Sequence, residues 1–201
     1  DVTKNVADMV LADDNFATIV AAVGEGRRIY DNIRKAIQFL LASNLSEVLG
    51  VFSATLMGFI LLKPVHLLFI NLVTDCFPAI ALGMESAEPD TMNRPPRDAG
   101  EGVFAGGLFG DIVYQGILVT VLTLLSYMIG NAFEAGRFAM PVGISEHGMT
   151  MAFLTMSMCE VFHSFNLRSQ RKSIFSLKSQ NKILWLAMMG SLLLTTAVLE
   201  I

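Results

Sequence analysis

Five long blocks of mainly apolar residues run through this chain, and their length limits what it can fold into. A helix needs roughly 20 mainly apolar residues to cross a hydrocarbon core of about 30 Å. The blocks are close to that length and cover residues 36–62, 66–84, 108–130, 149–165 and 183–201. Because the 53% of hydrophobic residues gather in these blocks, a soluble core does not account for them. The sequence therefore predicts an all-α membrane protein, a polytopic helical bundle of about five transmembrane helices.

The residues before the first block predict a cytoplasmic stalk. From Asn15 the apolar residues follow a helical spacing that no proline interrupts before Pro64. Asp13, Asp14 and Asn15 are candidate N-caps, so we expect one long helix from 15 to 62. The start has no initiator Met and the end has no polar flank, which indicates a piece of a larger protein. The expected domains are the end of a soluble domain (1–14), the stalk helix (15–35) and the transmembrane domain (36–201).

The positions of Lys and Arg predict the orientation in the membrane. Twelve of the 14 basic residues lie before the first block, between the second and third, or between the fourth and fifth. They are Lys4, Arg27, Arg28, Arg34, Lys35, Arg94, Arg97, Arg168, Arg171, Lys172, Lys178 and Lys182. Short cytoplasmic connections carry an excess of basic residues. We therefore expect the N-terminal segment and these connections to lie in the cytoplasm.

Polar side chains interrupt three of the apolar blocks, where an ionised group costs at least about 2.5 kcal/mol. They are Asn44 and Glu47 in the first block, Asn71, Thr74 and Asp75 in the second, and Glu160 in the fourth. Residues three or four apart share one face of a helix, so the first two sets each form one polar face. Ionisable residues inside a membrane face a cavity or a partner. We expect the two faces and Glu160 to converge on one site.

The ligand atoms available at such a site are oxygens. Pro78 lacks an N–H, so a regular helix would leave the carbonyl of Thr74 without its donor. Carboxylate, amide, hydroxyl and carbonyl oxygens suit Ca²⁺, which takes six to eight oxygen ligands at about 2.3–2.6 Å. The sequence therefore predicts a site for a hard cation. Two alternatives stay open: hydrogen bonds between helices for the amides and the hydroxyl, and a less favoured soft-metal site of Cys76, Cys159 and His163.

Several motifs in this order and spacing resemble the calcium-transporting P-type ATPases, of the sarco/endoplasmic reticulum type and their bacterial relatives. The stalk resembles that family's exit from the phosphorylation domain into the fifth transmembrane helix, with the sequence MVLADDNFATIVAAVGEGRRIYDNI. SNLSEV resembles the family's fifth helix, NLVTDCFPAIALGME resembles the sixth, and MTMAFLTMSMCEVFHSFNLRS resembles the eighth. PDTMNRPPR is similar to the loop after the sixth helix. The likeness covers essentially the whole chain, which would then supply helices five to nine.

The resemblance implies a role for each polar residue in the spans. A first calcium site would be formed by Asn44, Glu47, Thr74, Asp75 and Glu160, and a second by Asn71 and Asp75 with helix four. The sodium, potassium and proton pumps of the superfamily usually carry Asp where this chain has Asn71, which favours calcium over sodium or potassium. Acidic residues at both Glu47 and Glu160 favour two calcium ions per cycle. Cys76 replaces a small residue of the animal pumps and receives no role.

The resemblance also implies partners that this sequence does not contain. They are helices one to four and ten, the phosphorylated aspartate, and the domain that binds ATP with Mg²⁺. We expect the intact parent to be a P-type calcium-transporting ATPase of a bacterial cell membrane, and this piece alone not to hydrolyse ATP. As a hypothesis, the stalk helix passes domain motion to the site, calcium leaves to the outside, and protons return on Glu47, Asp75 and Glu160. The alternatives are a pump for Mn²⁺, Na⁺ or K⁺, a passive cation channel or secondary transporter, and a non-catalytic module.

Overall fold

The protein is a bundle of helices, described by a computed structural model for residues 5–7, 10–11, 15–98, 100–138, 140–141, 143–169 and 180–199. Its elements are α1 (Phe16–Met57), α2 (Pro64–Phe69), η2 (Ile70–Asp75), α3 (Cys76–Gly83), η3 (Thr91–Asn93), α4 (Leu108–Ala135), α5 (Glu146–Asn166) and α6 (Lys182–Leu199). No strand is named in this part of the chain, and one isolated bridge joins Phe59 to Gly143. The predicted all-α membrane architecture is confirmed.

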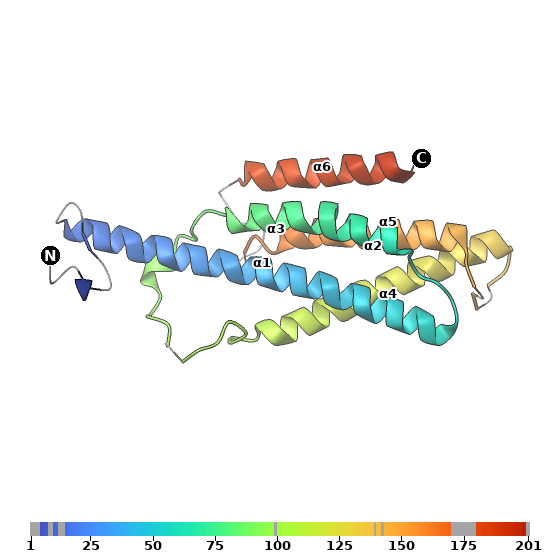
Figure 1. The fold of residues 1–201 in the computed structure, drawn as a ribbon, viewed down its shortest axis with the longest axis horizontal. Coiled ribbons are helices and arrows are strands. Elements are labelled where there is room, and N and C mark those ends of the chain that lie inside the picture. Colours follow the sequence, from blue (N-terminus) through green and yellow to red (C-terminus); the bar gives the residue numbers. More distant parts are fainter. Residues whose placement is uncertain are drawn as a thin grey trace.

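The longest helix, α1, extends well beyond the rest of the bundle at its N-terminal end, as Figure 1 shows. Asn15 is its N-cap, and the side-chain oxygen of Asn15 accepts a hydrogen bond from the N–H of Ala17. The other two candidate caps lie outside the described residues. The expected continuation to residue 62 is wrong. The helix ends at Met57 because Gly58 adopts φ +85, and its N–H bonds back to the preceding turn.

The second predicted span is one helical run that changes its winding in the middle. Pro64 occupies the first turn, where its missing N–H costs nothing. The segment η2 is a π-helix, in which the N–H of Cys76 donates to the carbonyl of Asn71 five residues earlier. Helix α3 then continues to Gly83. The π-helix η2 (Ile70–Asp75), called the wide turn below, contains all three polar residues predicted for the span.

Four helical runs are long and apolar enough to cross a membrane, judged by length and composition: α1, Pro64–Gly83, α4 and α6. The remaining predicted span, 149–165, forms the 21-residue helix α5 but is not among these four. Its polar residues include Glu160 and Ser157, which are fully buried against other helices. Helix α5 therefore turns these polar side chains toward the other helices, while Phe162 on the same helix is 60% exposed.

Helices α4 and α5 pack most closely at two glycines. A Cβ atom built on Gly130 would lie 2.6 Å from the carbonyl oxygen of His147 and 2.8 Å from the Cα of Gly148. Next to this crossing, the Tyr127 ring stacks on Phe59 with 4.5 Å between centroids. The residues after α1 thus form part of the core and are not a loose loop, since Phe59 is 3% exposed.

Candidate cation site in the membrane

The wide turn places Asp75 in the centre of the bundle, facing α1. Asp75 is 1% exposed, and its Oδ2 accepts a hydrogen bond of 2.6 Å from the hydroxyl of Ser43. Its other oxygen, Oδ1, is buried and has no hydrogen-bond partner among the described residues. Ser43 therefore holds one carboxylate oxygen and leaves the second available to a ligand.

Glu47 and Asn71 form a second link between α1 and the wide turn. The amide nitrogen of Asn71 donates to both carboxylate oxygens of Glu47, at 2.8 Å each, and to the carbonyl of Leu67. Glu47 is 8% exposed. Because Glu47 and Ser43 are four residues apart, they share one face of α1. That face meets both Asn71 and Asp75.

Glu160 reaches the same region from α5. It is 0% exposed, and neither of its carboxylate oxygens has a hydrogen-bond partner among the described residues. Helix α5 packs against η2, the segment that contains Asp75. A buried carboxylate without a hydrogen bond or counter-charge is unfavourable. The free energy of this arrangement therefore falls if a cation or a proton joins it.

The other two predicted site residues differ in where they lie. Thr74 is fully buried beside Asp75, and its hydroxyl donates to the carbonyl of Ile70 in its own helix. Asn44 is exposed, and its amide donates to the carbonyl of Leu40 one turn earlier. The described chain therefore brings together Glu47, Asn71, Thr74, Asp75 and Glu160, but not Asn44.

Ser43 is the site residue that the sequence interpretation missed. From the sequence, Asn44 and Glu47 pair at i and i+3 on one helical face. In the structure, the buried face of α1 contains Ser43 and Glu47 at i and i+4. Both spacings are compatible with a helix. Which one faces inward depends on the rotation of α1 against the wide turn, which the local sequence does not determine.

A backbone carbonyl also gains an outside donor, although not the one expected. The sequence predicts that Pro78 frees the carbonyl of Thr74, and this stays a prediction. The carbonyl of Val73, one residue earlier, accepts a hydrogen bond of 3.0 Å from the hydroxyl of Ser191 on α6.

These side chains do not by themselves form a metal site of the compact kind. Among the described residues, no group of three or more His, Cys, Asp and Glu side chains is placed to hold a metal ion. The cysteines and His163 are likewise not gathered: Cys76 is exposed, Cys159 is half-buried, and the His163 ring packs on Phe39. The oxygens of the carboxylates, Asn71 and Thr74 suit a hard cation, which takes more ligands than three carboxylates supply.

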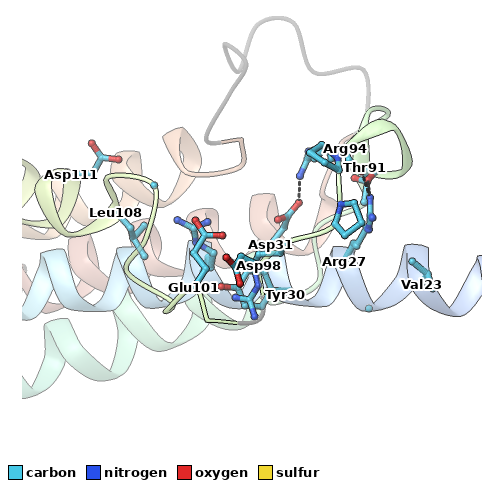
Figure 2. Close-up of a pocket in the computed structure, with 16 residues that line it drawn as sticks. Val23, Arg27, Tyr30, Asp31, Thr91, Arg94, Asp98, Glu101, Leu108 and Asp111 are labelled. Atoms are coloured by element: carbon cyan, nitrogen blue, oxygen red, sulfur yellow. Dashed lines mark hydrogen bonds and ion pairs between the residues drawn. The ribbon is translucent and has the colours of Figure 1, made fainter. Parts of the chain in front are cut away.

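Outside the apolar region, α1 and the connection after α3 enclose a polar cleft of about 810 Å³ (Figure 2). Arg27 donates to the carbonyls of Thr91 and Arg94, which fixes the connection on α1. Arg94 in turn pairs with Asp31 at 2.6 Å and with Asp90 at 3.2 Å. Burial lowers the pKa of Arg94, but these two carboxylates outweigh it and the net pKa lies above the usual value. Arg94 therefore stays charged and anchors the connection to the stalk.

Comparison with known proteins identifies the family. A family model described as the C-terminus of cation transporting ATPases matches residues 59–201. The chain is 41% identical to calcium-transporting ATPase 1 of Bacillus cereus and 43% identical to calcium-transporting ATPase of Bacillus subtilis, covering 100% and 99% of this chain and 24% and 22% of those proteins. It is 36% identical to an endoplasmic reticulum-type calcium-transporting ATPase 3 of Arabidopsis thaliana, over 96% of this chain and 21% of that protein.

The chain thus spans less than a quarter of the length of each of these three curated relatives. The resemblance drawn from the motifs is confirmed over the whole chain, and it places the described helices in the membrane part of those proteins. Since the family model covers most of its residues, the chain belongs to the cation-transporting ATPases and corresponds to their C-terminal membrane region.

Proposed function

We propose that this chain supplies the membrane transport part of an ATP-driven calcium pump. One observation carries the proposal: Asp75 Oδ1 and both oxygens of Glu160 are buried without hydrogen-bond partners among the described residues, on helical segments that pack against each other. Repulsion between buried carboxylates is relieved by a cation, and oxygen ligands favour calcium. The bacterial and plant relatives are all named calcium-transporting ATPases, which supports the choice of ion.

The proposed ligands are Glu47, Asn71, Thr74, Asp75 and Glu160. Asn44 remains a proposed ligand on the resemblance alone, because its amide faces away from this group. ATP and Mg²⁺ would bind outside this chain. Helices one to four and ten and the cytoplasmic domains would be its partners within a bacterial cell membrane.

The transport step follows from the two links between α1 and the wide turn. Movement of the stalk would displace Ser43 and Glu47 on α1 from Asp75 and Asn71 on η2. That displacement breaks the ligand group and releases calcium to the outside. Protons would then neutralise the three buried carboxylates while the cation is absent, which gives proton countertransport.

The experiment is phosphoenzyme formation from ATP in the intact pump, with Ca²⁺, Mn²⁺, Na⁺ and K⁺ titrated separately. We expect Ca²⁺ to trigger phosphorylation and Asp75→Asn to abolish it, because the substitution removes the charge held by Ser43. Activation by Na⁺ or K⁺, or high-affinity calcium dependence in the Asp75→Asn protein, would contradict the assignment. Ion flux without ATP would favour the passive channel.

A further inference from the structure

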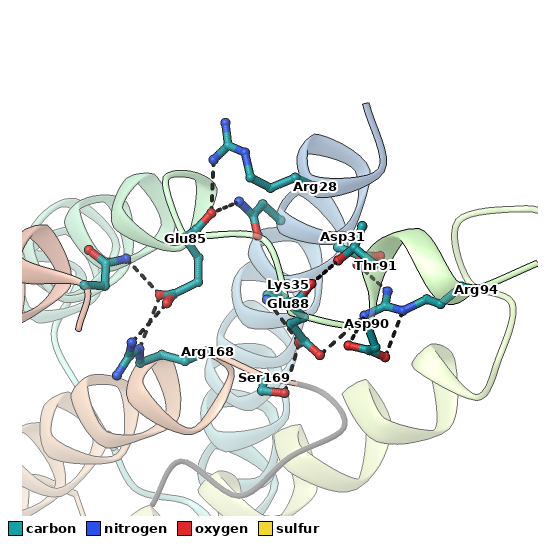
Figure 3. A network of polar contacts seen from close by, with 12 residues as sticks. Arg28, Asp31, Lys35, Glu85, Glu88, Asp90, Thr91, Arg94, Arg168 and Ser169 are labelled. Atoms are coloured by element: carbon teal, nitrogen blue, oxygen red, sulfur yellow. Dashed lines mark hydrogen bonds and ion pairs between the residues drawn. The ribbon is translucent and has the colours of Figure 1, made fainter. Parts of the chain in front are cut away.

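A buried ion pair joins the ends of the two helical runs that carry Asp75 and Glu160. Glu85 follows α3 and Arg168 follows α5, and their side chains are 3% and 4% exposed. The guanidinium of Arg168 donates from Nη2 to Oε1 of Glu85 at 3.0 Å and from Nε to Oε2 at 3.3 Å (Figure 3). Two parallel hydrogen bonds fix the direction as well as the distance between the partners.

Helices α1 and α6 also form hydrogen bonds with Glu85 or the residues beside it. Asn181, just before α6, donates to Oε2 of Glu85 at 2.9 Å and to the carbonyl of Ala81 at 2.8 Å. On the opposite side, Asn32 and Arg28 of α1 donate to the carbonyl of Glu85 at 2.7 and 3.0 Å. Glu85 thus joins α3 to three other helices: its carboxylate accepts hydrogen bonds from residues that flank α5 and α6, and its backbone carbonyl accepts them from α1.

Apolar side chains of α3 and α5 pack beside this pair. They are Ala79, Ala81 and Leu82 of α3, with Val161, Phe165 and Leu167 from α5 and the turn that follows it. Apolar contacts are not directional, so the ion pair is the contact that fixes the direction between the two ends. A buried ion pair adds little stability over an apolar pair of the same volume, and its best-attested role is to select one register.

The distances along the chain make this register important for the site. Glu85 lies ten residues after Asp75, and Arg168 lies eight residues after Glu160. At about 1.5 Å per residue, Asp75 lies about 12 Å before the end of α3 and Glu160 about 9 Å before the end of α5, and one short turn then leads to each member of the pair. The paired ends therefore bring Asp75 and Glu160 to the same level of the bundle.

We propose that Glu85 and Arg168 are positioning residues whose ion pair sets the axial register of α3 against α5, so that Asp75 and Glu160 meet at one cation site. The inference rests on the proposed function, since it assigns a role to the pair in calcium binding. It concerns residues outside the ligand group.

The test replaces the pair by apolar side chains, Glu85→Leu with Arg168→Met, in the intact pump. Equilibrium binding of radioactive calcium and thermal unfolding without calcium are measured on the same preparations. We expect an unchanged or higher unfolding temperature, because neither member of the pair is left as an unpaired buried charge. Calcium affinity should fall by about two- to thirtyfold, the range for residues that touch no ligand but bias its site.

Two variants complete the design. Arg168→Lys keeps the positive charge but loses the two parallel hydrogen bonds to Glu85. The variant protein should therefore remain folded and still bind calcium more weakly than the wild type. Ser169→Ala is the matched control: it alters the neighbouring residue, whose hydroxyl bonds to Glu88 and not to Glu85, and it should bind calcium as the wild type does.

The inference is overturned if the apolar pair binds calcium with wild-type affinity, or if affinity falls only together with the unfolding temperature. Unchanged calcium binding by Arg168→Lys has the same consequence. The proposed function fails separately, if the wild-type pump neither binds calcium nor forms a calcium-dependent phosphoenzyme.

Discussion

Glu160 has unfavourable surroundings, because both oxygens of its carboxylate are buried and have no hydrogen-bond partner in the part of the chain that the structure describes. Replacing it by Gln removes the charge at nearly constant volume. We expect Glu160→Gln to lower calcium affinity strongly, because the charge that meets the cation is gone, and to leave the unfolding temperature without calcium near that of the wild type, in which a proton neutralises Glu160. Differential scanning calorimetry and calcium binding on the same protein would check both effects. A fall in both quantities would mean that Glu160 stabilises the fold.

Ser43 provides a test of how Asp75 is oriented. Ser43→Ala removes the donor to Oδ2, and we expect calcium affinity to drop about tenfold, as for other groups that orient a metal ligand. Ser46 is the control, because it is equally buried on the same helix but donates only to the carbonyl of Ser43. Equal effects of the two substitutions on calcium binding would show that Ser43 has no special role.

At the scale of elements, the close crossing of α4 and α5 depends on a missing side chain. Gly130→Ala places a Cβ atom against the backbone of His147 and Gly148, which cannot move aside as a flexible side chain does. We expect a loss of about 1–3 kcal/mol in the free energy of unfolding. Gly190→Ala in α6 has nothing within 4 Å of its added Cβ and should lose no stability. Denaturant titration in mild detergent compares the two.

The sequence predicts where the membrane helices lie. It does not predict where α1 ends or which face of α1 points into the bundle. Block length alone identifies the spans, because the bilayer sets it. The end of α1 depends on the left-handed conformation of Gly58, and apolar Phe59 to Leu62 look the same in a core loop as in a helix. The wide turn depends on packing around Asp75. Only the tertiary arrangement explains why Ser43, rather than Asn44, faces that carboxylate.

At the scale of the whole molecule, the orientation in the membrane stays a prediction from the basic residues. Met92 and Phe138 are exposed in connections at opposite ends of the bundle. A membrane-impermeant maleimide should label Met92→Cys only from the cytoplasmic side and Phe138→Cys only from the outside. The unsubstituted protein, with Cys76 and Cys159, is the background control. The reverse labelling pattern would place the stalk outside.

The wide turn also changes the phase of the second span. The exposed large apolar residues along it are Val65, Leu68, Leu72, Phe77, Ile80 and Met84. Their spacing is three, four, five, three and four, with the single five-residue step across η2. A helical wheel drawn at a constant 100° per residue therefore misplaces every residue after Asp75 by one position. Deleting one residue from 70–75 would remove the five-residue step. Either Asp75 would then turn away from Ser43, or the exposed apolar residues of α2 would turn away from the face that they now share with those of α3.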